Sequence, residues 1–256
     1  MTYDCHVHVP SSRGTWGLPH FGPGAYLSQM DALEVDVSLM LPFDGLYHDP
    51  TTCNDEVAQW CAAAPERLVP FGTAAPRDSS APDEITRCVD RLGMRGFKFH
   101  PWMQAFHPLD VDMLPVYERC LDHRVPVMFH DGTPPLSTPL QVAQVAARYP
   151  GLTVILGHGG LNDLYGEAIE AARTYRNVWI CMSSLHAHAM RRIVAEAPLD
   201  RIVFGSDAGL AASERHSYVD YRWSVVRDIG LPPATYRQIM EENPARLLGG
   251  GAGAGE

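Results

Sequence analysis

The sequence predicts an α/β fold, the parallel (β/α)8 TIM barrel, on three observations. Short apolar runs alternate with helical patterns along almost the whole chain. The runs are rich in Val, Ile, Leu and Phe and nearly continuous in apolarity, which is typical of parallel strands buried on both faces. Eight strand–helix units fit into 256 residues, the usual length of such a barrel. A doubly wound open sheet is the competing fold, but its Gly-rich first turn is missing here.

The predicted strands follow one another at regular intervals. They are expected over residues 3–9, 35–41, 68–73, 96–100, 125–130, 153–157, 178–183 and 202–206. Each run is too short for a helix and is bounded by turn signals. Residues that favour helix N-caps stand between the runs, at Asn54, Asp83, Asp112 and Thr138. They predict helices over 55–63, 84–92, 114–123 and 140–149, with Gly93 as the stop signal of the second.

Composition and charge limit the classes of function. The net charge of −10 and the lack of basic runs argue against a nucleic acid or an anionic membrane as a partner. No apolar run reaches the length of a membrane span, and a signal peptide is not expected. Six scattered cysteines indicate free thiols in a cytoplasmic protein. One domain is expected over 1–248, with a disordered Gly/Ala-rich tail over 249–256.

The most informative motif is the pair His6 and His8 in the first predicted strand. Residues two apart in a strand point the same way, so the two imidazoles converge as the first nitrogen ligands of a divalent metal must. The spacing alone is a weak signal, because about 0.5 such pairs are expected by chance. His186 and His188 repeat it later in the chain. The first pair therefore gains its weight from the other predicted strands.

Titratable side chains also end several of those strands. They are Lys98 and His100, His130, His158 and Asp207, at the ends of the fourth, fifth, sixth and eighth predicted strands. The carboxyl ends of barrel strands meet at one rim, where the active sites of this fold lie. Burying these groups unpaired would cost several kcal/mol each. A shared functional site at this rim explains the set better than a structural core does.

In this order, the motifs resemble the amidohydrolase superfamily, in the compact branch that includes aminocarboxymuconate-semialdehyde decarboxylase. The resemblance covers almost the full length. It is carried by Asp4-x-His6-x-His8, the run from Gly96 to Pro101, His130, His158-Gly159-Gly160, Gly205-Ser206-Asp207 and the closing run from Asn243 to Gly249. The ordered combination is highly specific, whereas no single piece is.

The resemblance implies a divalent metal bound by His6, His8, His130 and Asp207, with His158 beside it as a catalytic group. Zinc is the expected metal, because three imidazoles, a carboxylate and an open water position suit it. Iron, manganese or cobalt would also fit. In this arrangement Asp207 would take the proton of a metal-activated water, and His158 would polarise the attacked carbonyl.

Two reactions are compatible with this set of residues. The first is hydrolysis of an amide, lactone, ester or cyclic carbonyl bond of a small molecule. The alternative is non-oxidative decarboxylation of a small unsaturated or aromatic acid, in which the metal and His158 protonate the carbon that loses CO2. A metal-binding scaffold without catalysis is a third interpretation, and the presence of both Asp207 and His158 argues against it.

Lys98 leaves the number of metals open. As an ordinary ammonium it would pair with Asp207 or a substrate carboxylate, and the site would hold one metal. As a carboxylated lysine, like that of binuclear relatives such as ureases and dihydroorotases, it would bridge two metals. His130 and His158 would then bind the second one. We favour the ammonium.

The loops after the strands are expected to shape the substrate pocket. His100 shares a face with Lys98 and is expected to contact the substrate, as are Trp102 and Arg13. A guanidinium such as that of Arg13 can bind a carboxylate through two hydrogen bonds. Aromatic side chains in these loops, such as that of Trp102, indicate a small, partly flat substrate. A homodimer is suggested by the resemblance alone.

Overall fold

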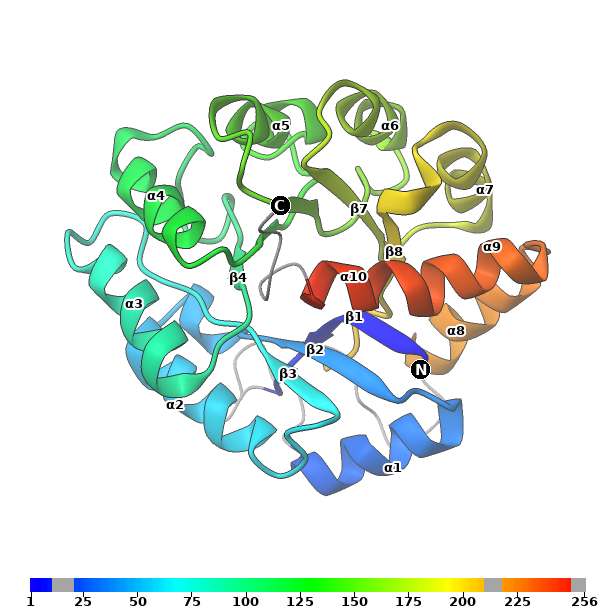
Figure 1. Ribbon diagram of the computed structural model, residues 1–256, viewed down its shortest axis with the longest axis horizontal. Helices are drawn as coiled ribbons and strands as arrows, with labels where there is room; N and C mark the ends of the chain where they lie inside the picture. Colours follow the sequence, from blue (N-terminus) through cyan, green and yellow to red (C-terminus); the bar gives the residue numbers. More distant parts are fainter. Residues whose placement is uncertain (11–20, 210–217, 250–256) are drawn as a thin grey trace.

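The structure confirms the predicted barrel. The computed structural model describes residues 1–10, 21–209 and 218–249. Within these residues, parallel strands form one sheet of order β1-β2-β3 and another of order β4-β5-β6-β7-β8. Isolated parallel bridges from Gly72 to Phe97 and from Val7 to Ala208 connect the two sheets at both seams. The helices surround the strands as a ring (Figure 1).

The strands are short, and a helix follows each of them. The strands are β1 (Tyr3–His8), β2 (Val37–Leu41), β3 (Leu68–Pro70), β4 (Phe97–Phe99), β5 (Val127–Phe129), β6 (Val154–Leu156), β7 (Val178–Met182) and β8 (Ile202–Phe204). The helices are α1 (Pro23–Leu33), α2 (Pro50–Cys61), α3 (Ala81–Leu92), α4 (Leu114–Asp122), α5 (Pro139–Arg148), α6 (Tyr165–Thr174), α7 (Ala187–Glu196), α8 (Tyr218–Asp228), α9 (Pro233–Arg237) and α10 (Asn243–Gly249).

Strand side chains alternate between the surrounding helices and the barrel interior. In β5, Val127 and Phe129 belong to the large apolar cluster shared with the helices. Met128 lies between them in a smaller cluster with Ile155 of β6. Because neighbouring strand residues point to opposite faces, this smaller cluster fills the barrel interior. Leu247 of α10 belongs to it as well, and α10 lies across one end of the barrel (Figure 1).

Local signals explain where two of the helices begin and end. Thr138 caps α5 as predicted. Its side chain accepts the backbone N–H of Gln141, whose side chain in turn accepts the backbone N–H of Thr138, which is a capping box. Gly93 ends α3 with a left-handed φ of 68°, a conformation that glycine adopts without steric cost.

Asn54 is not an N-cap, and here the sequence prediction is wrong. α2 begins earlier, because the Asp49 carboxylate accepts the backbone N–H groups of Thr51 and Thr52. Asn54 is buried inside the helix, and its side-chain amide exchanges two hydrogen bonds of 2.9 Å with the backbone of Thr73. It therefore connects α2 to the segment that follows β3. Its pairing, rather than a cap, accounts for a buried amide in this helix.

A β-bulge in β1 alters the direction of its side chains. The pairing with β2 shifts between Asp4 and Val7. Cys5 lies in the interior cluster, and the adjacent His6 also points inward, with its Nε2 atom 3.4 Å from the Nζ atom of Lys98. Strict alternation would have turned Cys5 away from the site side of the strand. The bulge instead lets two successive residues face the interior.

Three further expectations concern the cysteines, the membrane and the end of the chain. All six cysteines are buried and form no disulfide. Among the residues with described structure, no helix is long and apolar enough to cross a membrane. Gly249, which we expected in the disordered tail, is the last residue of α10, and the rest of that predicted tail lies outside the described residues.

Candidate active site

His6, His8 and Asp207 form a group that can bind a metal ion. One ligand atom of each residue lies within 4.8 Å of those of the other two. The Nε2 atoms of His6 and His8 are 3.4 Å and 3.5 Å from Oδ1 of Asp207. The histidines come from β1, and Asp207 follows β8, so the site lies across the seam between the first and last strands. Nitrogen and carboxylate ligands of this kind suit a divalent transition metal.

Backbone carbonyls orient both imidazoles. Nδ1 of His6 lies 2.9 Å from the carbonyl oxygen of Gly157, and Nδ1 of His8 lies 3.2 Å from that of Pro42. A carbonyl accepts only, so each Nδ1 carries the proton and donates it. Each Nε2 atom then presents its lone pair to the centre of the site, the arrangement found for metal-binding histidines.

Asp207 is oriented in the same way. Its backbone is left-handed, with a φ of 62°, and its Oδ2 atom accepts a 2.8 Å hydrogen bond from the hydroxyl of Ser184. Its Oδ1 atom is buried without a hydrogen-bond partner within the described chain. Burial alone would raise the pKa of Asp207, but the nearby His8 and His158 and the hydrogen bond from Ser184 lower this pKa below its usual range. An ionised, unpaired oxygen therefore faces the two histidines.

Lys98 places a buried positive charge beside these residues. Only 1% of its surface is exposed, and its Nζ atom lies 3.4 Å from Nε2 of His6. Burial lowers the pKa of Lys98 to about 8, while Asp207 and Asp131 act in the opposite direction. Gly157 provides the space, because a Cβ atom there would lie 3.1 Å from Nζ. The site thus offers a desolvated cation to an anionic ligand.

The other histidines form a row that extends from His6. The ring centroids of His6 and His158 are 4.7 Å apart, those of His158 and His130 are 4.4 Å apart, and His130 stacks on His100 at 3.8 Å. Burial lowers the pKa of all four rings, to about 3 for His130, so that they are neutral at pH 7. Nδ1 of His158 is buried and has no hydrogen-bond partner in the described chain.

The structure brings some of the predicted site residues together and separates others. His6 lies beside the other four residues of one cluster, which are His8, Asp207, Lys98 and His158. His130 lies next to them, but its Nε2 atom is bonded to Oγ1 of Thr133 at 2.8 Å, and it is not part of the group of ligand atoms. Its role as a fourth metal ligand stays a prediction.

The predicted substrate residues lie farther out. His100 is 5% exposed, whereas Trp102 is 54% exposed, with its ring centroid 6.3 Å from that of His100. Arg13 lies outside the described residues. Their contacts with a substrate stay predictions.

Sequence reasoning did not foresee the roles of two buried carboxylates that shape the site, Asp131 and the Asp4 of the first motif. Asp131 accepts the backbone N–H groups of His158 and Gly160, both at 2.6 Å, and so fixes the turn that carries His158. Asp4 accepts the backbone N–H of Ser206 at 2.9 Å, next to Asp207. Burial raises the pKa of both carboxyl groups to about 6. Asp131 follows His130, and Asp4 comes two residues before His6. Nothing in this spacing indicates that the carboxylates accept backbone N–H groups from other parts of the chain.

A comparison with models of protein families identifies the family of this chain. Residues 3–250 match the family model described as Amidohydrolase. The chain belongs to the amidohydrolase family. It is therefore an enzyme, and the three-residue ligand group described above is a place where it could hold a metal ion. Comparison with curated protein sequences finds no match.

Several solved structures share the fold of this amidohydrolase. The 5-carboxyvanillate decarboxylase of Sphingomonas paucimobilis is 18% identical, with a TM-score of 0.74 over 96% of this chain and 98% of that one. A dihydroxybenzoic acid decarboxylase of Polaromonas sp. JS666, with bound manganese and the inhibitor 2-nitroresorcinol, is 16% identical, with a TM-score of 0.75 over 96% of both chains. The 4-oxalomesaconate hydratase of Rhodopseudomonas palustris is 18% identical, with a TM-score of 0.72 over 98% of this chain and 96% of that one. At these identities the similarity establishes the barrel fold.

Proposed function

We propose that this amidohydrolase is a metal-dependent, non-oxidative decarboxylase of a small aromatic or unsaturated carboxylic acid. The observation that carries the proposal is the buried Lys98 ammonium beside the His6–His8–Asp207 group. A desolvated cation between neutral imidazoles favours an anionic substrate. Two of the similar structures are decarboxylases of aromatic acids, which supports this reaction over the hydrolysis that we predicted first.

The residues present fit a single divalent metal. His6 and His8 turn their Nε2 atoms toward Oδ1 of Asp207, and this oxygen has no hydrogen-bond partner within the described residues. The described residues contain one such group of ligand atoms, which favours one metal and an uncarboxylated Lys98. When bound, the metal would act as a Lewis acid toward an oxygen of the substrate. Zinc is the metal we propose, and manganese is the alternative because one similar structure contains it.

The side chains of this site divide the remaining tasks. Lys98 would attract the acid and bind one of its oxygen substituents. His158, protonated once the substrate anion lies beside it, would donate that proton to the carbon that carries the carboxylate. The bond to the carboxylate then breaks, its electron pair returns to the substrate, and CO2 leaves. The substrate anion and one proton thus give the decarboxylated product and CO2. Asp131 would keep His158 in place through the two backbone N–H groups.

Assays on two panels of substrates test this proposal. The purified protein, loaded with Zn²⁺ or Mn²⁺, is incubated with hydroxybenzoates and other aromatic acids, and separately with lactones, esters and cyclic amides. We expect CO2 release from an aromatic acid and, in D2O, one deuterium at the carbon that lost the carboxylate. Acid release from a lactone or amide without CO2 would instead assign the hydrolase reaction.

Matched histidine variants test the proton donor. His158→Gln should reduce the rate about 100-fold or more, as expected for loss of a general acid. His186→Gln is the control, since His186 is exposed at the start of α7 and makes no side-chain cap bond. Equal rates for the two variants would remove His158 from the mechanism.

A homodimer, a cytoplasmic location and a small-molecule substrate as the main partner stay predictions.

A further inference from the structure

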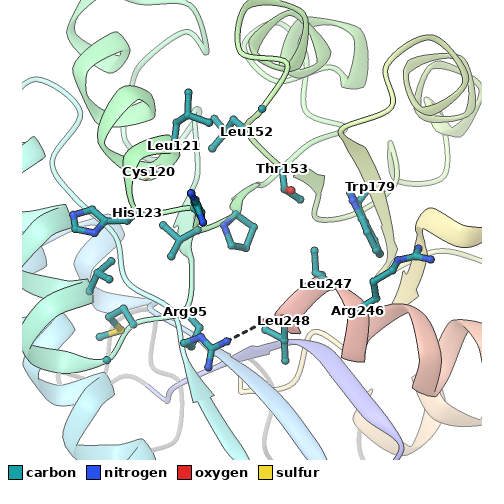
Figure 2. A pocket seen from close by; sticks show the side chains of 17 residues that line it. Arg95, Cys120, Leu121, His123, Leu152, Thr153, Trp179, Arg246, Leu247 and Leu248 are labelled. Atoms are coloured by element: carbon teal, nitrogen blue, oxygen red, sulfur yellow. Dashed lines mark hydrogen bonds between the residues drawn. The ribbon is translucent and has the colours of Figure 1, made fainter. Parts of the chain in front are cut away.

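A second pocket lies at the opposite end of the barrel from the candidate active site. It has a volume of about 760 Å³, and its lining comes from the segments that lead into β4, β5 and β6, from the start of β7 and from α10 (Figure 2). Because these segments precede the strands, the pocket is at the amino end of the barrel. Its size is that of pockets that bind small molecules.

Arginines supply the charge of this pocket. Its lining includes Arg95, Arg124 and Arg246, together with His123 and, among the residues described, no Asp or Glu. This composition is opposite in sign to that of the whole chain, whose net charge is −10. Cationic groups gathered in a concave, partly apolar site concentrate the electrostatic potential there and attract anions.

Two of the arginines are held in position by the protein, and one is unengaged. Arg95 donates to the carbonyl of Leu248 at 2.8 Å (Figure 2). The guanidinium of Arg246 lies 5.1 Å from the centroid of the Trp179 ring and donates to the carbonyl of Asp200. The guanidinium of Arg124 makes no hydrogen bond or ion pair with the described part of the chain. Each of the three keeps N–H donors for a ligand, since a guanidinium has five.

We propose that this pocket binds a small organic anion with two or more carboxylate or phosphate groups. Planar guanidinium groups recognise both kinds of oxyanion through paired hydrogen bonds. Leu121, Val125 and Leu247 supply an apolar wall against which the body of the ligand packs. His123 adds a smaller contribution, because its Nδ1 atom already lies 3.9 Å from the Asp90 carboxylate.

Calorimetric titration of the metal-loaded protein tests the pocket with defined probes. Benzene-1,3,5-tricarboxylate represents the carboxylates, fructose 1,6-bisphosphate represents the phosphates, and benzene-1,3,5-tricarboxamide is the neutral analogue. We expect one of the two anions to bind and the amide not to bind. Lys98→Met should leave this binding in place, because Lys98 lies at the other end of the barrel. Loss of binding in Lys98→Met would assign the anion to the candidate active site.

A pair of arginine variants separates the pocket from general attraction. Arg124→Gln should weaken the binding about tenfold or more through loss of a charged hydrogen bond, with no change in metal content. Arg176→Gln is the control, because Arg176 is exposed before β7 at the same barrel end and does not line the pocket. Equal weakening by both variants, or no binding to the unaltered protein at about 1 mM, would overturn the proposal. Removal of residues 250–256 is a further test. If the anion then bound much more tightly, the result would indicate that the end of the chain occupies the pocket, and it would overturn the proposal.

Discussion

The two ends of the barrel are built from the same strands but carry opposite chemistry. Toward the amino end the interior side chains are apolar, including Met128, Ile155 and Val203. Two residues further along the same strands, or just after them, the interior holds His130, Gly157 and Gly205. Asp207 lies another two residues beyond. Buried apolar side chains therefore stabilise the amino end of the barrel. At the carboxyl end, residues suited to a chemical reaction take the place of such side chains.

Polar groups at the carboxyl end are tolerated because the backbone satisfies them. Asp4 and Asp131 accept backbone N–H groups, and His6 and His8 donate to carbonyls. Among the predicted site residues that the structure describes, the buried atoms without a hydrogen-bond partner are Oδ1 of Asp207 and Nδ1 of His158. We propose that these two side chains meet the metal or the substrate. The comparison teaches that the barrel separates stability from chemistry along β5, β6 and β8, within about two residues.

The largest expected effect is on the metal site itself. Asp207→Asn removes the ionised oxygen that faces both histidines, so the variant should lose most of its metal and at least about 1,000-fold in activity. Metal content per chain and the rate of CO2 release measure this. Asp200→Asn, an exposed change, is the control. Full metal content in Asp207→Asn would contradict the ligand assignment.

A change at the other end should affect stability alone. Ile155 is fully buried in the barrel interior, and Ile155→Ala should lower the free energy of unfolding by about 2–5 kcal/mol. Metal content should be unchanged. Leu140→Ala, on the exposed surface of α5, is the control and should cost much less. Chemical denaturation measures both. Loss of metal in a folded Ile155→Ala protein would break the separation between the two ends.

Lys98→Met tests whether the buried charge of Lys98 at the carboxyl end lowers the free energy of unfolding. Burial lowers the pKa of Lys98 from 10.5 to about 8, so folding the charged lysine is unfavourable below pH 8, and this penalty fades as the pH rises toward 10.5. We expect Lys98→Met to stabilise the metal-free protein by about 1–3 kcal/mol at pH 7 and by less at pH 10, while activity is lost. Denaturation at both pH values measures the difference. A destabilised variant at pH 7 would show that the ammonium contributes to folding.

The smallest expected effect concerns the orientation of Asp207. Ser184→Ala removes the hydrogen bond to Oδ2, so metal affinity should fall about tenfold with little change in stability. Ser183→Ala is a matched control, since the hydroxyl of Ser183 is buried without a partner in the described structure. Competition with a fluorescent chelator measures both affinities. Equal affinities would show that the backbone alone orients Asp207.

Sequence patterns predicted the barrel because a strand that is buried on both faces needs a nearly continuous run of apolar residues. They also placed His6, His8, Lys98, His158 and Asp207 at one rim, since parallel strands end together. They missed the bulge in β1, because an extra residue in a strand depends on its pairing with β2 rather than on local composition. They also missed the roles of Asp131 and Ser184, which depend on backbone atoms brought near by other strands.

The position of the site across the β1–β8 seam has a consequence for synthesis of the protein. His6 and His8 leave the ribosome about 200 residues before Asp207. Asp207 donates its backbone N–H to the carbonyl of His6 at 2.8 Å only once the last strand is in place. A nascent chain therefore carries two ligands without a third until the ring closes. Metal loading reports completion of the barrel, and an unfinished chain should be unable to retain the ion.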